Sequence, residues 1–191
     1  MRKLLVAGLM SVGTVASGLA QGTVSFENAL SAGSITLHSA FGPYAAAGTY
    51  TVALLWAPGT SVVPQASLTQ IALYGLATGG LTQTGFFQDP MAVTTGAATA
   101  GGTAAIFEVI GWTGGYNNYA TAISSGALWG VTAEFVNNTA NPSLVPQPTP
   151  VNLTGWDGNL ILESPEPGTL ALAALGTAGI WFFRRTNRQP R

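Results

Sequence analysis

The chain has 191 residues, of which 47% are hydrophobic and 7% charged, so its length fits one folded domain with short targeting segments. It contains no cysteine, which excludes disulfides, thiolate metal sites and cysteine nucleophiles. The net charge is −1, but every Lys and Arg lies in residues 2–3 or 184–191. The region between them has one histidine and no Lys or Arg with which to neutralise phosphates, which excludes nucleic-acid binding.

The N-terminus has the three-part pattern of a secretory signal. Arg2 and Lys3 precede a run of apolar residues. The small residue Ala20 stands just before Gln21, at the position where signal peptidase recognises a small side chain. We therefore predict a signal peptide over residues 1–20, cleaved between Ala20 and Gln21. The alternative is a permanent anchor or a buried helix, which the glycines within the run disfavour.

The region that follows reads as short apolar or alternating runs separated by turn residues, with no helical pattern of useful length. We expect strands at residues 23–27, 34–38, 50–56, 70–74, 103–112, 127–137 and 160–163. Such a series of short strands predicts a mainly β fold, specifically an antiparallel β-sandwich ectodomain over residues 21–163.

Alternation within two of these runs predicts which side chains form the core, because successive side chains of a strand point to opposite faces. One face of the run at 50–56 carries Tyr50, Val52, Leu54 and Trp56. One face of the run at 127–137 carries Trp129, Val131, Ala133 and Phe135. We expect these two strands to face one another or to pack across the sandwich.

Paired turn residues separate the strands. They are Pro58-Gly59, Gly79-Gly80, Gly101-Gly102 and Gly114-Gly115. Residues 141–150 carry several prolines and therefore predict a loop or a stiff extended connector, since proline cannot donate a hydrogen bond to a central strand.

The region offers little chemistry to an enzyme. His38 ends a predicted strand without a nucleophile-elbow pattern nearby, so we interpret it as a strand-end or surface residue. Glu108 and Glu134 lie inside strong strand candidates and are the pair to consider for acid and base roles in glycoside cleavage, the alternative being two edge or surface glutamates. Asp157-Gly158-Asn159 is too short to supply a calcium shell, and we expect no metal and no cofactor.

The best binding candidate is an aromatic stretch that includes Trp112, Tyr116 and Tyr119. Aromatic faces with amide neighbours suit the CH surfaces and hydroxyls of sugars, so we predict these three residues as glycan contacts. The alternative is that the rings cover an edge of the core. The glycosylation sequons at Asn137 and Asn152 are weak signals.

The C-terminal segment places an apolar stretch over residues 168–183 before a basic end over residues 184–191. A helix over the apolar stretch would rise about 24 Å, slightly less than the ~30 Å hydrocarbon core of a bilayer, so it can span with local thinning. Arg184 and Arg185 would act as stop-transfer charges on the cytoplasmic side. The chain would then be held by a short transmembrane helix with its ectodomain outside.

The tripeptide Pro165-Glu166-Pro167 stands directly before that stretch. Over residues 164–191 the chain resembles the PEP-CTERM sorting tail, in which this signature precedes a short apolar helix and an arginine-rich end. The resemblance implies that an exosortase recognises the tripeptide and is a transient partner of the chain. Bacteria with this system also make exopolysaccharide. Gly168 stands where the family commonly has serine or threonine, and an unprocessed tail anchor is the alternative.

Three functions are open for the ectodomain. The leading hypothesis is a non-catalytic protein of the cell surface or extracellular matrix, linked to exopolysaccharide or biofilm, that passes through the inner membrane in transit. The second is a carbohydrate-binding or adhesion module, which exposure of the three aromatic residues in one groove would favour. The third is a glycan-cleaving enzyme, which would need Glu108 and Glu134 to converge in a pocket.

Overall fold

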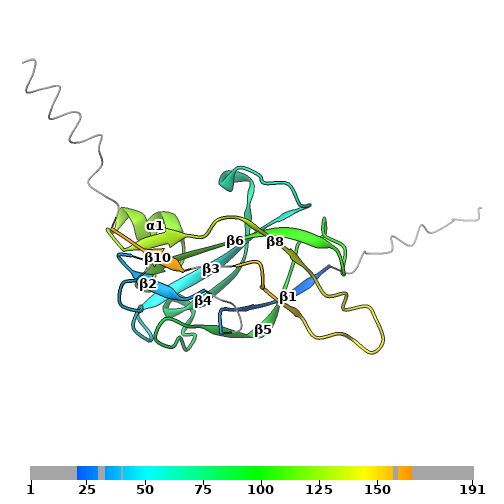
Figure 1. The fold of residues 1–191 in the computed structure, drawn as a ribbon, viewed down its shortest axis with the longest axis horizontal. Coiled ribbons are helices and arrows are strands. Elements are labelled where there is room, and N and C mark those ends of the chain that lie inside the picture. Colours follow the sequence, from blue (N-terminus) through cyan, green and yellow to red (C-terminus); the bar gives the residue numbers. More distant parts are fainter. Residues whose placement is uncertain (1–20, 30–32, 40, 157–158, 165–191) are drawn as a thin grey trace, which may run out of the picture.

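The computed structural model describes residues 21–29, 33–39, 41–156 and 159–164 (Figure 1). The predicted signal peptide, the sorting signature, the transmembrane helix and the basic end all lie outside these residues. In chain order the strands are β1 (Thr23–Glu27), β2 (Ile35–Leu37), β3 (Tyr50–Pro58), β4 (Thr69–Gly75), β5 (Gln88–Thr94), β6 (Ala104–Thr113), β7 (Trp129–Val131), β8 (Phe135–Asn138), β9 (Val151–Asn152) and β10 (Leu160–Leu162). The helices are η1 (Gln65–Ser67), η2 (Leu76–Thr78) and α1 (Tyr119–Ser124).

The expectation of a mainly β fold is confirmed, with one correction to its strand directions. The largest sheet has the order β4-β3-β6-β7, with β8 also paired to β6, and all of its pairs are antiparallel. A second sheet has the order β5-β1-β9, and a third consists of β10 and β2. The pairs β1–β9 and β10–β2 are parallel, because β9 and β10 come from the end of the domain and return beside strands near its start.

The main hydrophobic core lies between the five-stranded sheet and the two smaller sheets. It includes the predicted face of β3, whose Tyr50, Val52, Leu54 and Trp56 are all buried. The smaller sheets contribute Val24, Phe26, Ile35, Leu160 and Leu162. The core prediction for β3 is therefore confirmed, and the paired turn glycines are confirmed as well, since Gly59, Gly79, Gly102 and Gly114 have positive φ angles.

The prediction for residues 127–137 is wrong, because a β-bulge divides the run into β7 and β8. Ile110 pairs with Val131 and Phe107 with Phe135, so two residues of β6 lie opposite the three residues 132–134. One extra residue reverses which side chains face the core. Phe135 accordingly joins the main core, whereas Trp129 packs on the opposite face of the sheet and is only half-buried.

The bulge also changes where the strands lie relative to one another. Both β7 and β8 pair with β6, which itself pairs with β3, so the two predicted core strands are separated within one sheet rather than packed across two. Thr132 stabilises the bulge: its amide donates to the Val109 carbonyl at 2.9 Å, and its Oγ1 accepts from the Val109 amide at 3.0 Å.

A second, smaller hydrophobic cluster covers the outer face of the five-stranded sheet. Its buried members are Ala53, Ile110, Trp112, Ala122 and Ala127. The helix α1 supplies Ala122 and begins after Asn118, whose Oδ1 accepts a hydrogen bond from the Thr121 amide at 2.8 Å. This short helix was not predicted from the sequence.

A pair of glycines lets β10 approach the five-stranded sheet. Gly111 of β6 and Gly130 of β7 are register partners. A Cβ atom at Gly111 would lie 2.7 Å from Leu160 Cδ2, and one at Gly130 would collide with the backbone carbonyl of Ile161. Side chains at these positions would therefore displace β10, the last strand of the domain.

Candidate functional site

The outer face of the five-stranded sheet carries a shallow cavity of about 290 Å³. It is lined by Leu55, Gln65, Ala66, Gln70, Ile110 and Tyr119. These residues come from β3, η1, β4, β6 and the first residue of α1. The cavity therefore combines hydrophobic side chains of the sheet with one amide group from η1, one from β4 and one aromatic ring.

The Tyr119 ring, which lines this cavity, packs against the rings of two tryptophans. The centroid of the Tyr119 ring lies 6.3 Å from that of Trp112 and 5.3 Å from that of Trp129, the latter in an edge-to-face arrangement. Trp112 is fully buried, and its Nε1 donates to the Tyr116 carbonyl at 3.0 Å. Tyr119 is partly exposed and lines the cavity.

The predicted glycan platform therefore needs a correction. Trp112 exposes no surface with which to contact a sugar, because its position on β6 points it into the cluster beneath α1. Tyr116 packs against the same cluster and does not line the cavity. Of the three predicted contacts, Tyr119 alone lines the cavity, together with Gln65 and Gln70, which sequence reasoning did not identify.

Glu108 lies on the same face of β6 as Ile110 and opposite Leu55 of β3. The residue is 5% exposed, and its Oε1 accepts a hydrogen bond from Gln65 Nε2 at 2.7 Å. Burial raises the pKa of the Glu108 carboxyl, the Gln65 bond opposes that change, and the negative charge of Glu134 adds to it. Burial, followed by the charge of Glu108, also raises the pKa of Tyr119.

Both glutamates of the candidate catalytic pair bind the connection between β3 and β4. Glu134 Oε2 accepts from the Val63 amide at 3.1 Å, two residues before the Gln65 that binds Glu108. Glu134 lines two small cavities of about 20 and 60 Å³, and Glu108 lines neither. Their carboxylates thus hold a loop against the sheet and do not share the lining of either cavity.

The remaining candidates lie elsewhere. His38 is exposed directly after β2, with a φ of 66°. Asn137 is 4% exposed, and its side chain binds the Asn138 and Asn152 carbonyls and the Thr154 amide, so burial makes its sequon inaccessible.

Asn159 Oδ1 accepts from the Ser34 hydroxyl at 2.6 Å, while Asp157 and Gly158 lie outside the described residues. Within the described ranges no group of three or more His, Asp or Glu residues could hold a metal.

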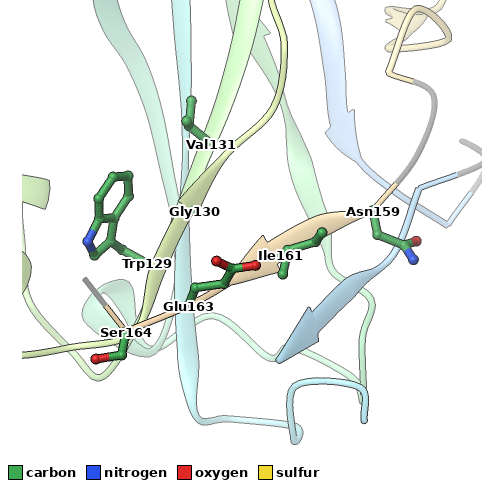
Figure 2. Close-up of a pocket in the computed structure, with 7 residues that line it drawn as sticks. All are labelled: Trp129, Gly130, Val131, Asn159, Ile161, Glu163 and Ser164. Carbon is green, nitrogen blue, oxygen red and sulfur yellow. The ribbon is translucent and has the colours of Figure 1, made fainter. Parts of the chain in front are cut away.

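A larger cavity, of about 410 Å³, lies where the described chain ends. It is lined by Trp129, Gly130, Val131, Asn159, Ile161, Glu163 and Ser164, and Figure 2 shows that these residues come from β7 and from β10 with its flanks. The backbones of Trp129 and Glu163 exchange two hydrogen bonds of 2.9 Å. The fold is therefore fixed up to Glu163, two residues before the Pro-Glu-Pro tripeptide.

The described residues thus form a mainly β domain that contains no Lys or Arg, and the tail segment follows it directly in the sequence. The family model of the PEP-CTERM protein-sorting motif matches residues 165–188. The chain thus carries a PEP-CTERM motif at its C-terminus, which marks it as an exported substrate of an exosortase. No curated protein and no solved structure matches the chain. None of the helices in the described part is long and apolar enough to cross a membrane.

Proposed function

We propose that the protein is a non-catalytic component of the cell surface or extracellular matrix, delivered by an exosortase and associated with exopolysaccharide or biofilm. In this proposal residues 1–20 are a signal peptide and residues 21–163 are a β-sandwich ectodomain. Residues 168–183 hold the chain in the inner membrane during transit. The observation that carries the proposal is the sorting motif at residues 165–188, which begins directly after the last strand of the domain.

The bonding of the carboxylates supports a non-catalytic role over glycan cleavage. Glu108 and Glu134 each accept a hydrogen bond from the β3–β4 connection, and these bonds explain their presence without a reaction. A glycosidase pair instead needs both carboxyls to reach one substrate-sized space, about 5 to 9.5 Å apart. A carbohydrate-binding module is the second candidate, favoured by the exposed part of Tyr119 beside amide groups.

The sorting part of the proposal is tested by replacing the tripeptide Pro165-Glu166-Pro167 with alanines. The altered chain should remain unprocessed in the inner membrane, because the signature is lost while the apolar stretch and the arginines Arg184 and Arg185 still anchor it. Cell fractionation and mass spectrometry of the chain termini measure this. The parent protein should begin at Gln21, and a tripeptide variant that reaches the surface at normal size would refute the proposal.

A further inference from the structure

The cavity beside Tyr119 has the composition of a sugar site. Leu55, Ile110 and the Tyr119 ring provide an apolar floor and wall, onto which the CH face of a pyranose can pack. Gln65 and Gln70 also line the cavity, and their amides can bond to hydroxyl groups. Its volume of about 290 Å³ lies at the small end of ligand pockets, which suits one sugar unit of a longer chain.

Parts of this site are held in place before any ligand arrives. Gln65 Nε2 is fixed by its bond to the buried Glu108, and the Val63–Glu134 bond holds the same connection. Tyr119 is packed between the rings of Trp112 and Trp129. A site that is already ordered loses less conformational entropy on binding, so a shallow cavity can still bind measurably.

Two polar groups of the site are available to a ligand. The hydrogen bond to Glu108 uses the amide nitrogen of Gln65, which leaves its carbonyl oxygen as an acceptor. Gln70 is exposed, and its side chain makes no hydrogen bond within the part of the chain that the structure describes. Each amide can therefore meet a hydroxyl group without breaking a bond of the fold.

The charge around the cavity selects against acidic sugars. Residues 21–163 contain six carboxylates and no Lys or Arg, and Glu108 lies directly under the bonded Gln65. This region therefore has no Lys or Arg to pair with a uronate, sulfate or phosphate group, and the nearby carboxylates repel such a group. An uncharged sugar avoids this cost.

We propose that the cavity formed by Leu55, Gln65, Ala66, Gln70, Ile110 and Tyr119 binds an uncharged sugar unit of a neutral polysaccharide. This inference rests on the proposed function and names the ligand class of the ectodomain. It differs from the aromatic platform predicted from the sequence, because it uses Tyr119 together with two glutamines on the outer face of the sheet.

The test is a glycan array of neutral and uronate-containing oligosaccharides, probed with the full-length chain in a detergent without a sugar head group. Calorimetry with the best neutral ligand then measures affinity. Neutral glycans should bind and uronate polymers should not. Tyr119→Ala should weaken binding about tenfold through loss of the ring contact. Because Tyr119 also packs against two tryptophans, Gln70→Ala serves as the second variant and should weaken binding about three- to tenfold.

Tyr44→Ala is the matched control, since Tyr44 is 53% exposed and does not line the cavity; it should bind as the parent does. Equal binding of uronate polymers, or unchanged affinity of both site variants, would overturn the inference. Delivery of the protein to the cell surface is measured separately, on the cells that produce it. A parent protein that reaches the surface but binds no neutral glycan overturns this site alone, whereas a failure of tail-dependent delivery overturns the proposed function.

Discussion

Replacing Trp56 with alanine is the sharpest test of the core. Trp56 lies on β3, is 7% exposed and belongs to the main hydrophobic cluster. Its Nε1 donates a hydrogen bond to Thr99 Oγ1 at 3.1 Å, and Thr99 is itself 2% exposed. Truncation removes a large apolar group and leaves a buried hydroxyl without this partner.

The expected cost follows from these two losses. Removing a buried tryptophan side chain costs about 3 to 5 kcal/mol, and a buried hydroxyl that loses a partner adds about 1 kcal/mol. Domains of this size unfold with about 5 to 15 kcal/mol, so Trp56→Ala should lie close to the unfolding threshold. Trp56→Phe keeps most of the volume but loses the hydrogen bond, and it should cost less than Trp56→Ala.

Trp129→Ala is the control, because sequence alternation alone would place Trp129 in the same core. Trp129 is half-buried on the opposite face, so we expect a loss of about 1 to 2 kcal/mol. Urea unfolding of residues 21–164, followed by far-ultraviolet circular dichroism, gives the free energies. If Trp129→Ala cost more than Trp56→Ala, the assignment of faces by the bulge would be refuted, and if Trp56→Ala cost under about 1 kcal/mol, the burial of Trp56 in the core would be refuted.

Three further predictions concern polar groups. Burial raises the pKa of Glu108, so the folded chain binds this proton more tightly than the unfolded chain, and stability should fall as the pH rises from the usual carboxyl range through the raised pKa. Glu108→Gln keeps an acceptor for Gln65 and should flatten that part of a stability-against-pH curve and exceed the parent in stability at pH 7; a less stable variant there would contradict the reasoning. Asn137→Ala should cost about 2 to 4 kcal/mol in the same urea assay, because several backbone groups of residues 138–155 lose a buried partner, and a change below 0.5 kcal/mol would show that this side chain does not organise the segment. Added salt should leave the melting temperature of residues 21–164 unchanged or slightly higher, since residues 21–163 contain no Lys or Arg that could form ion pairs, and a clear fall would argue against this.

The alternation of apolar residues predicted the core-facing side chains of some strands and not of others. The alternation of β3 correctly identified the side chains that join the main core, because β3 keeps a continuous register with β6 from Tyr50 to Pro58. The same reasoning failed at residues 132–134, where one inserted residue leaves the apolar alternation of the sequence intact. The insertion nevertheless reverses which face of the sheet the alternate side chains occupy. The parallel pairs β1–β9 and β2–β10 join distant segments, and no local signal encodes them.

Other elements had signals that were too weak or were not used. β5 contains Pro90, which fits its position at the edge of a sheet but argues against a strand in the sequence. α1 spans only six residues, too few for a helical period, and Asn118 as its N-cap was the one available signal.

The candidate site was predictable only in part. Tyr119 was found because aromatic residues cluster near it in the sequence. Gln65 and Gln70 were missed because two exposed glutamines in a loop and an outer strand have no distinguishing pattern. Their significance arises from the pairing of β3 with β4 and from the bond to Glu108, which are both tertiary features.

The glycine pair beneath β10 bears on the order of events during export. A chain that crosses a membrane from its N-terminus delivers residues 160–162 last among those of the domain, yet Leu160 and Leu162 are fully buried and β10 pairs with β2 near the start. Until those residues emerge, no strand covers the sheet at Gly111 and Gly130, and β2 lacks its partner strand β10. Long-range pairings of this kind close late in folding. The Pro-Glu-Pro tripeptide follows within a few residues, so the domain reaches its final packing only as the sorting signal itself emerges.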